Sequence, residues 1–106
     1  MIINSTKGLK TLRHLIHYNL FIQTKTTPNP NFLKFVPAGK VVMKTGTMDI
    51  AAAKYATCSP LARKLFNLDG IARVFYGYDH ISVAKKEEAD WNILKPQVYA
   101  LIEDQF

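Results

Sequence analysis

The sequence predicts an α+β fold, in which a small antiparallel sheet carries two to three helices packed on one face. Three patterns lead to this expectation. Short apolar segments bounded by proline and glycine indicate strands within residues 20–43. A hairpin pattern occupies residues 71–85, and apolar residues recur at helical spacing in residues 59–70 and 87–106. Strands joined by short turns pair antiparallel, so the helices are expected on one side of the sheet.

The first strands are expected early in the chain. Residues 20–25 alternate loosely between apolar and polar side chains, and residues 32–36 read FLKFV. Residues 37–39, Pro-Ala-Gly, end this second strand, and residues 40–43 (KVVM) favour a third short strand.

An unusual alternation of proline and asparagine separates the first two strands. Thr27 and Asn29 each precede a proline, which pushes both towards an extended backbone. The side chains of Asn29 and Asn31 can hydrogen-bond to nearby backbone groups and replace ladder partners that the prolines remove. The segment is interpreted as an ordered connector. The alternative is a partner-docking loop formed by Thr27, Pro28, Asn29, Pro30 and Asn31.

Two helical segments follow. Residues 49–56 (DIAAAKYA) favour a helix capped by Asp49. Ser59 is expected to cap the next helix, with Pro60 at its first position and Gly70 at its end. The apolar stripe of this helix comprises Leu61, Ala62, Leu65, Phe66 and Leu68.

The hairpin and a last helix complete the fold. Residues 71–75 and 81–83 are expected to pair around a turn at residues 77–80. Asp90 is expected to cap the last helix, and Pro96 must lie near its first turn or kink it. The expected buried face of this helix comprises Ile93, Leu94, Val98, Leu101 and Ile102.

Charge is distributed unevenly along the chain. Residues 1–48 carry seven Lys or Arg and no acidic residue, whereas residues 49–106 carry seven basic and eight acidic residues. The acid-free, basic and amphipathic pattern of residues 1–20 predicts a mitochondrial presequence, with a poorly ordered basic tail as the alternative. Residues 21–106 are then expected to form one domain.

Several functional classes are disfavoured. Cys58 is the single cysteine, which excludes a disulfide framework, and no apolar run reaches the roughly 18 residues that span a membrane. His14 and His17 make a poor metal site without a third ligand. Cys58 and His80 could form a nucleophile pair, but nothing in the sequence orients His80, and a helix start explains Cys58 and Ser59. No catalytic residue is therefore expected.

Nucleic-acid binding is a further alternative. Residues 32–35 mix aromatic and basic side chains, as single-strand platforms do, although Phe32 and Phe35 also suit a core. The sequence lacks an RNA-recognition signature and a Gly-rich phosphate loop. The lysines of this basic region are Lys25, Lys34, Lys40 and Lys44.

Four stretches carry a resemblance to a known family. They are TPNPN with LKF at residues 27–35, SPLARKLF at 59–66, GIARVFYGYDHISVAK at 70–85 and DWNILKPQVYALI at 90–102. In this order they resemble the N-terminal domain of the Nfu-type mitochondrial iron–sulfur cluster scaffold proteins. The resemblance covers nearly all of residues 21–106.

The resemblance implies a role in delivering iron–sulfur clusters in the mitochondrial matrix, with the assembly machinery and client proteins as partners. In that family a C-x-x-C motif in a second domain holds the cluster. This chain ends at Phe106 without such a motif, and Cys58 matches no family ligand. The chain is therefore expected to be a non-catalytic accessory domain without a cofactor of its own. The alternatives are an iron or iron–sulfur carrier that uses Cys58 across a dimer, and a basic nucleic-acid-binding module.

Overall fold

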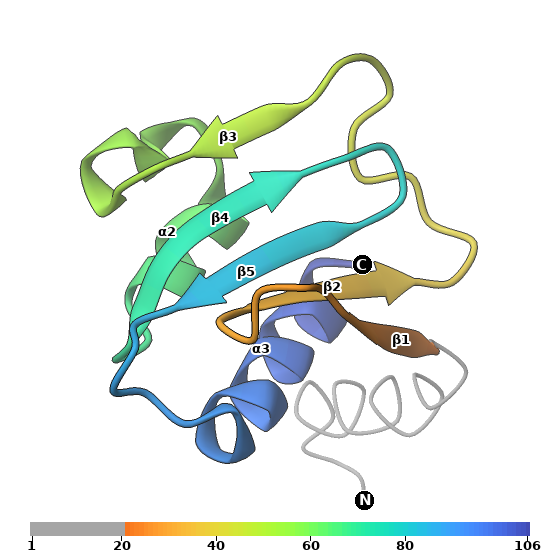
Figure 1. The fold of residues 1–106 in the computed structure, drawn as a ribbon. Helices are drawn as coiled ribbons and strands as arrows, with labels where there is room; N and C mark the ends of the chain where they lie inside the picture. Colours follow the sequence, from red (N-terminus) through yellow and green to blue (C-terminus); the bar gives the residue numbers. More distant parts are fainter. Residues whose placement is uncertain (1–20) are drawn as a thin grey trace, which may run out of the picture.

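In the computed structural model, which describes residues 21–106, the chain forms a five-stranded antiparallel sheet with helices on one face (Figure 1). The predicted α+β class is confirmed. The elements in chain order are β1 (Ile22–Thr26), β2 (Phe32–Pro37), β3 (Met48–Ile50), the 3-10 helix η2 (Ala53–Cys58), α2 (Pro60–Phe66), β4 (Ile71–Tyr76), β5 (Ile81–Lys85) and α3 (Trp91–Gln105).

The strands lie in the order β1-β2-β5-β4-β3. Two hairpins, β1–β2 and β4–β5, meet where β2 pairs with β5, and Phe35 lies opposite Ile81 there. The short strand β3 adds to the far side of β4, with Met48 opposite Tyr76. Because side chains alternate along a strand, every second side chain of each strand points towards the helices.

The core lies between the sheet and the helices α2 and α3. Its largest fully buried side chains come from four strands and both helices, so these elements share one apolar interior. They are Phe35, Pro37, Ile50, Leu65, Val74, Ile81, Val83, Leu94, Val98 and Ile102.

The prediction of a third strand at residues 40–43 is wrong. Gly39 turns the chain with a φ of 75°, and the backbone N–H groups of Val42 and Met43 donate to the Tyr78 carbonyl at 2.7 and 3.3 Å. The segment is therefore held by the β4–β5 turn and pairs with no strand. The third strand is Met48–Ile50.

The helix predicted at residues 49–56 is only partly present. Asp49 lies in β3 opposite Phe75, and its carboxylate binds the Arg73 guanidinium at 2.6 and 2.9 Å. These tertiary contacts override the helix propensity of the first residues. A 3-10 helix then begins at Ala53.

The predicted start of α2 is confirmed, but its predicted end at Gly70 is wrong. The Ser59 side chain accepts a hydrogen bond from the Ala62 N–H at 3.2 Å, and Pro60 is the first helical residue. The helix ends at Phe66, with Asn67 as its C-terminal cap. Gly70 instead enters β4 with a φ of 105°, and an added Cβ there would lie 2.8 Å from the Ala89 Cβ.

The last helix begins as predicted, because Asp90 accepts a hydrogen bond from the Asn92 N–H at 2.9 Å. Pro96 lies inside α3. Ile93 was predicted to be buried, but 64% of it is exposed. The predicted hairpin of β4 and β5 is also confirmed. No helix among the described residues is long and apolar enough to cross a membrane.

Candidate functional site

The candidate site is the loop at residues 27–31, called here the TPNPN loop, which joins β1 to β2. Internal hydrogen bonds fix its shape. The Thr27 hydroxyl lies 2.8 Å from the Asn29 carbonyl oxygen, to which it donates, and it accepts from the Asn29 N–H at 3.2 Å. The Asn29 side-chain oxygen accepts from the Asn31 N–H at 2.9 Å. The Asn29 side chain thus bonds to nearby backbone, as predicted, whereas the Asn31 side chain bonds to a lysine side chain instead.

Two residues from elsewhere in the chain anchor the loop. The Lys85 ammonium donates to the Asn31 side-chain oxygen at 2.9 Å, and the Lys85 N–H donates to the Asn31 carbonyl at 2.8 Å. The Trp91 indole N–H donates to the Pro30 carbonyl at 3.0 Å. The loop is therefore fastened to the end of β5 and to the start of α3.

Trp91 also connects the loop to the core. Its ring centroid lies 6.2 Å from that of Phe35, and the Phe35 and Tyr99 rings meet edge-on at 5.6 Å. Sequence reasoning missed Lys85 and Trp91 as loop anchors. Both lie more than fifty residues from the loop, and no local pattern indicates such a contact.

The exposure of the loop defines what it can present. Pro28, Asn29 and Pro30 are exposed, whereas Thr27 and Asn31 are half-buried. A loop that is already ordered loses little conformational freedom when a partner binds it. A partner-docking role for these five residues stays a prediction.

Cys58 lies exposed at the end of η2. Its sulfur is 3.5 Å from the Met48 sulfur and 3.5 Å from the Tyr55 carbonyl oxygen. Within residues 21–106, no group of three or more His, Cys, Asp or Glu side chains is placed to hold a metal ion. The surroundings of Cys58 do not fit an iron–sulfur cluster, which ordinarily needs about four thiolate-type ligands.

The structure does not bring Cys58 and His80 together as a nucleophile pair. Cys58 contacts Met48, which lies opposite Tyr76 and so shares the helix-covered side of the sheet. His80 stacks on Phe75 with a centroid distance of 6.1 Å. Since Phe75 and Tyr76 are neighbours in β4, they point to opposite faces. His14 and His17 lie outside the described residues.

Four ionisable groups among residues 21–106 have shifted pKa values, and one of them is Arg73, whose pKa is raised by its hydrogen bonds to Asp49. Hydrogen bonds from Arg73 lower the pKa of the Asp49 carboxyl, and the bond with His80 lowers that of Asp79. Burial raises the pKa of the Tyr76 phenol, and the hydrogen bond with Ser59 partly offsets this rise. Each shift is explained by a structural contact, so none of them by itself indicates a catalytic group.

Comparison with known proteins identifies the family. Residues 22–106 match the family described as "Scaffold protein Nfu/NifU N terminal". The human "NFU1 iron-sulfur cluster scaffold homolog, mitochondrial" is 54% identical over 94 residues, which cover 88% of this chain and 36% of the human protein. "NifU-like protein 5, mitochondrial" of Arabidopsis thaliana is 47% identical over 85 residues, which cover 80% of this chain and 30% of that protein.

The chain spans about a third of the length of these relatives. A solution structure of a NifU-like protein from Saccharomyces cerevisiae is similar, with a TM-score of 0.73 and 27% identity over 81% of this chain and 77% of that one. A crystal structure of a Staphylococcus aureus protein shares the fold with a TM-score of 0.66 and 23% identity, over 76% of this chain and 96% of that one. The resemblance seen in the sequence is confirmed, and the chain belongs to the Nfu/NifU scaffold family, in which it corresponds to the N-terminal domain.

Proposed function

We propose that this chain acts in iron–sulfur cluster assembly as a non-catalytic interaction domain. The match of residues 22–106 to the scaffold family is the observation that carries this proposal. The human relative is named an iron–sulfur cluster scaffold homolog, and it is 54% identical to this chain. The chain's single thiol leaves it short of cluster ligands, so its contribution is contact with other proteins rather than cluster retention.

The partners in this proposal are the cluster assembly machinery and the client proteins that receive clusters. The anchored TPNPN loop supports such a role, because Pro28, Asn29 and Pro30 are exposed on a loop of fixed shape. A rigid, exposed loop on a scaffold of secondary structure is a common place for recognition residues.

The place of action in this proposal is the mitochondrial matrix. The human and Arabidopsis relatives are named mitochondrial. Residues 1–20 carry basic residues and no acidic ones, which suits a presequence that is removed after import.

Deletion of the gene in its own organism tests the proposal. We expect the activities of mitochondrial iron–sulfur enzymes to fall and to recover when the full chain is restored. A variant with Pro28→Ala and Pro30→Ala should restore less activity, whereas Lys54→Glu, in η2 after the opposite edge strand of the sheet, should restore it fully. Unchanged iron–sulfur enzyme activities after deletion would contradict the assembly role. Full restoration of enzyme activity by the loop variant would show that the loop has no part in the assembly role.

The exposure of Cys58 supports a second candidate function, an iron or iron–sulfur carrier. Cys58 is exposed, so two copies of the chain could bring two thiols together. Such a dimer would act as an iron or iron–sulfur carrier, and external thiols would have to complete the ligand set. Iron retention by the purified chain separates this function from the interaction role.

A further inference from the structure

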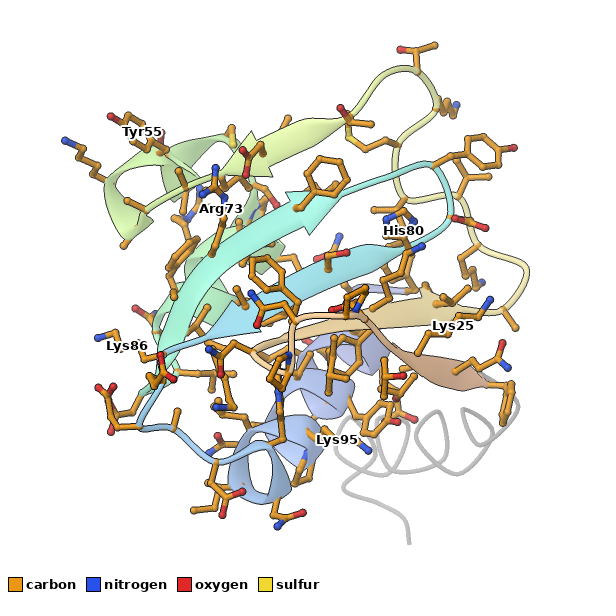
Figure 2. The ribbon with its side chains drawn as sticks, viewed as in Figure 1. Lys25, Tyr55, Arg73, His80, Lys86 and Lys95 are labelled. Carbon is orange, nitrogen blue, oxygen red and sulfur yellow. The ribbon has the colours of Figure 1, made fainter. Side chains whose placement is uncertain are left out.

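Within residues 21–106 no helix covers the second face of the sheet, called here the open face (Figure 1). The strand register places one row of side chains straight across it. The row consists of Lys25, Lys34, Ser82, Phe75 and Asp49, from β1, β2, β5, β4 and β3. A second row consists of Phe32, Ala84 and Arg73. Figure 2 shows Lys25 on β1, Arg73 on β4 and His80 at the β4–β5 turn, with Lys95 on α3.

A shallow hollow lies at the centre of the open face. Phe32, Phe75, Ser82, Arg73 and Asp49 line it, and its volume is about 350 Å³. Both phenylalanines are half-buried, and the small Ser82, which lies opposite Phe75, leaves space beside them. The hollow is open and large enough to admit a bulky apolar side chain, to which it offers two aromatic rings.

One side of the hollow is electrically neutral. Arg73 and Asp49 form a bidentate pair at 2.6 and 2.9 Å, so each satisfies the charge of the other. The pairing reduces the net charge that this side of the hollow presents to a ligand. This side of the hollow therefore favours an apolar group of a ligand.

The other side of the hollow is basic. Lys25 and Lys34 lie directly opposite each other in the β1–β2 hairpin, an arrangement that destabilises a sheet because like charges repel. Among the described residues neither lysine forms an ion pair. Asp79 feels the charge of Lys34, but its carboxylate is bonded to His80 at 3.1 Å. An exposed cation, Lys25, and a half-buried one, Lys34, thus lie on the same face as the hollow.

We propose that the open face binds an extended acidic peptide segment of a partner protein, with one aliphatic or aromatic anchor residue in the hollow. The carboxylates of the segment would lie over Lys25 and Lys34, and its anchor would contact Phe32 and Phe75. Complementary charge steers such a partner and fixes its direction across the strands. The open face is a different surface from the TPNPN loop, and its binding of an acidic peptide does not require a partner that handles iron–sulfur clusters.

The same face suits a single strand of nucleic acid less well. Arg73 is paired with Asp49, so the cations of this face that form no ion pair among the described residues are Lys25 and Lys34. Single-strand platforms combine a basic groove along the backbone with successive aromatic rings for successive bases. Here both rings border one hollow and do not form a row of successive stacking sites.

Selection from a random library tests the proposal. The probe is a phage library of 12-residue peptides, panned against the immobilised full chain. We expect enrichment of sequences with several Asp or Glu residues beside one Leu, Ile, Phe or Trp. A synthetic copy of an enriched peptide should then shift the amide NMR signals of β2, β4 and β5 on binding.

Matched variants locate the binding. The double variant Lys25→Glu and Lys34→Glu should weaken the peptide about tenfold or more, because it converts attraction into repulsion. Ser82→Leu should weaken it comparably by filling the hollow. Lys86→Glu, in the β5–α3 connection, is the charge-reversal control and should change little. Thermal melts establish that each variant is folded, and Lys25→Glu alone serves if the double variant unfolds.

Four results would overturn the proposal. The first two are that no sequence is enriched, or that the enriched peptides lack acidic residues. The third is that Lys86→Glu weakens peptide binding as much as the other variants do. The fourth is that a uridine 15-mer binds more tightly than the selected peptide and that the same variants weaken its binding. The last result would assign the open face to single-stranded RNA.

Discussion

Ser59 shows how one hydroxyl serves both local and tertiary structure. It caps α2 by accepting from the Ala62 N–H at 3.2 Å, and it lies 2.7 Å from the Tyr76 hydroxyl, with which it is hydrogen-bonded. The cap could be predicted, because Ser followed by Pro is a helix-start pattern. The Tyr76 contact could not, because it depends on how α2 lies across β4.

The two roles of Ser59 lead to a stability prediction. We expect Ser59→Ala to lower the free energy of unfolding by about 1–2 kcal/mol through loss of the cap. Tyr76→Phe should cost about 0.5–1.5 kcal/mol, the usual worth of one hydrogen bond. The double variant should cost less than the sum, since both changes remove the same Ser59–Tyr76 bond. Urea denaturation measures all three, and strictly additive costs would contradict the shared bond.

Tyr76 also predicts a dependence of stability on alkaline pH. Its pKa is raised in the folded protein, chiefly by burial. The neutral phenol therefore contributes stability that is fully present below the unfolded pKa of about 10 and is lost as pH rises through the higher folded pKa. We expect the wild-type chain to lose more stability than Tyr76→Phe above this pH. Parallel denaturant curves from pH 8 to 11 measure the difference, and identical slopes would contradict it.

At the scale of elements, Leu65 and Ile93 make a matched pair. Leu65 in α2 is fully buried, whereas Ile93 in α3 is 64% exposed. We expect Leu65→Ala to lower the free energy of unfolding by about 2–5 kcal/mol, because it removes apolar contact and leaves a cavity. Ile93→Ala should stay within about 0.5 kcal/mol of the wild type, as for most surface substitutions. A larger loss for Ile93→Ala would indicate that this side chain is covered in solution.

The elements that could be predicted are those with strong local signals. The β4–β5 hairpin has alternating strands around a turn with Gly77, where an added Cβ would overlap the His80 ring. The β3 strand could not be predicted, because Asp49 and Ile50 begin a segment with helix propensity and only their pairing with β4 places them in the sheet. Local propensity gives way where tertiary pairing supplies the hydrogen bonds.

The same limit applies to the candidate site. The stiffness of the TPNPN loop could be read from its prolines and asparagines, because these residues act on their own neighbours. Its anchors Lys85 and Trp91 could not be predicted, since their contacts with Asn31 and Pro30 exist only once the sheet and α3 have assembled.

At the scale of the whole molecule, the basic N-terminus predicts import. We expect residues 1–30, fused to a fluorescent reporter, to direct that reporter into mitochondria and to be shortened there by proteolysis. A matched fusion with Lys7, Lys10 and Arg13 changed to Glu should stay in the cytosol. Diffuse fluorescence from the unaltered fusion, without processing, would contradict the presequence.

Ligand counting predicts how the purified chain handles iron. A cluster ordinarily needs about four thiolate-type ligands, and one chain supplies Cys58 alone. After anaerobic reconstitution with iron and sulfide, without added thiol, we expect negligible iron to remain on the full chain after desalting. A stoichiometric cluster that disappears in Cys58→Ser would support the dimeric carrier instead.

The pairing of β2 with β5 determines when folding can be completed. Phe32 lies opposite Ala84, so the centre of the sheet joins segments that are far apart in the chain. Such non-local contacts form slowly, because a long loop must close before they contribute. As synthesis proceeds from the N-terminus, Phe35 stays without β5 beside it or α3 over it until both have left the ribosome. The strand order thus delays folding until β5 and α3 have been synthesised and gives chaperones an interval in which to bind the β1–β2 segment.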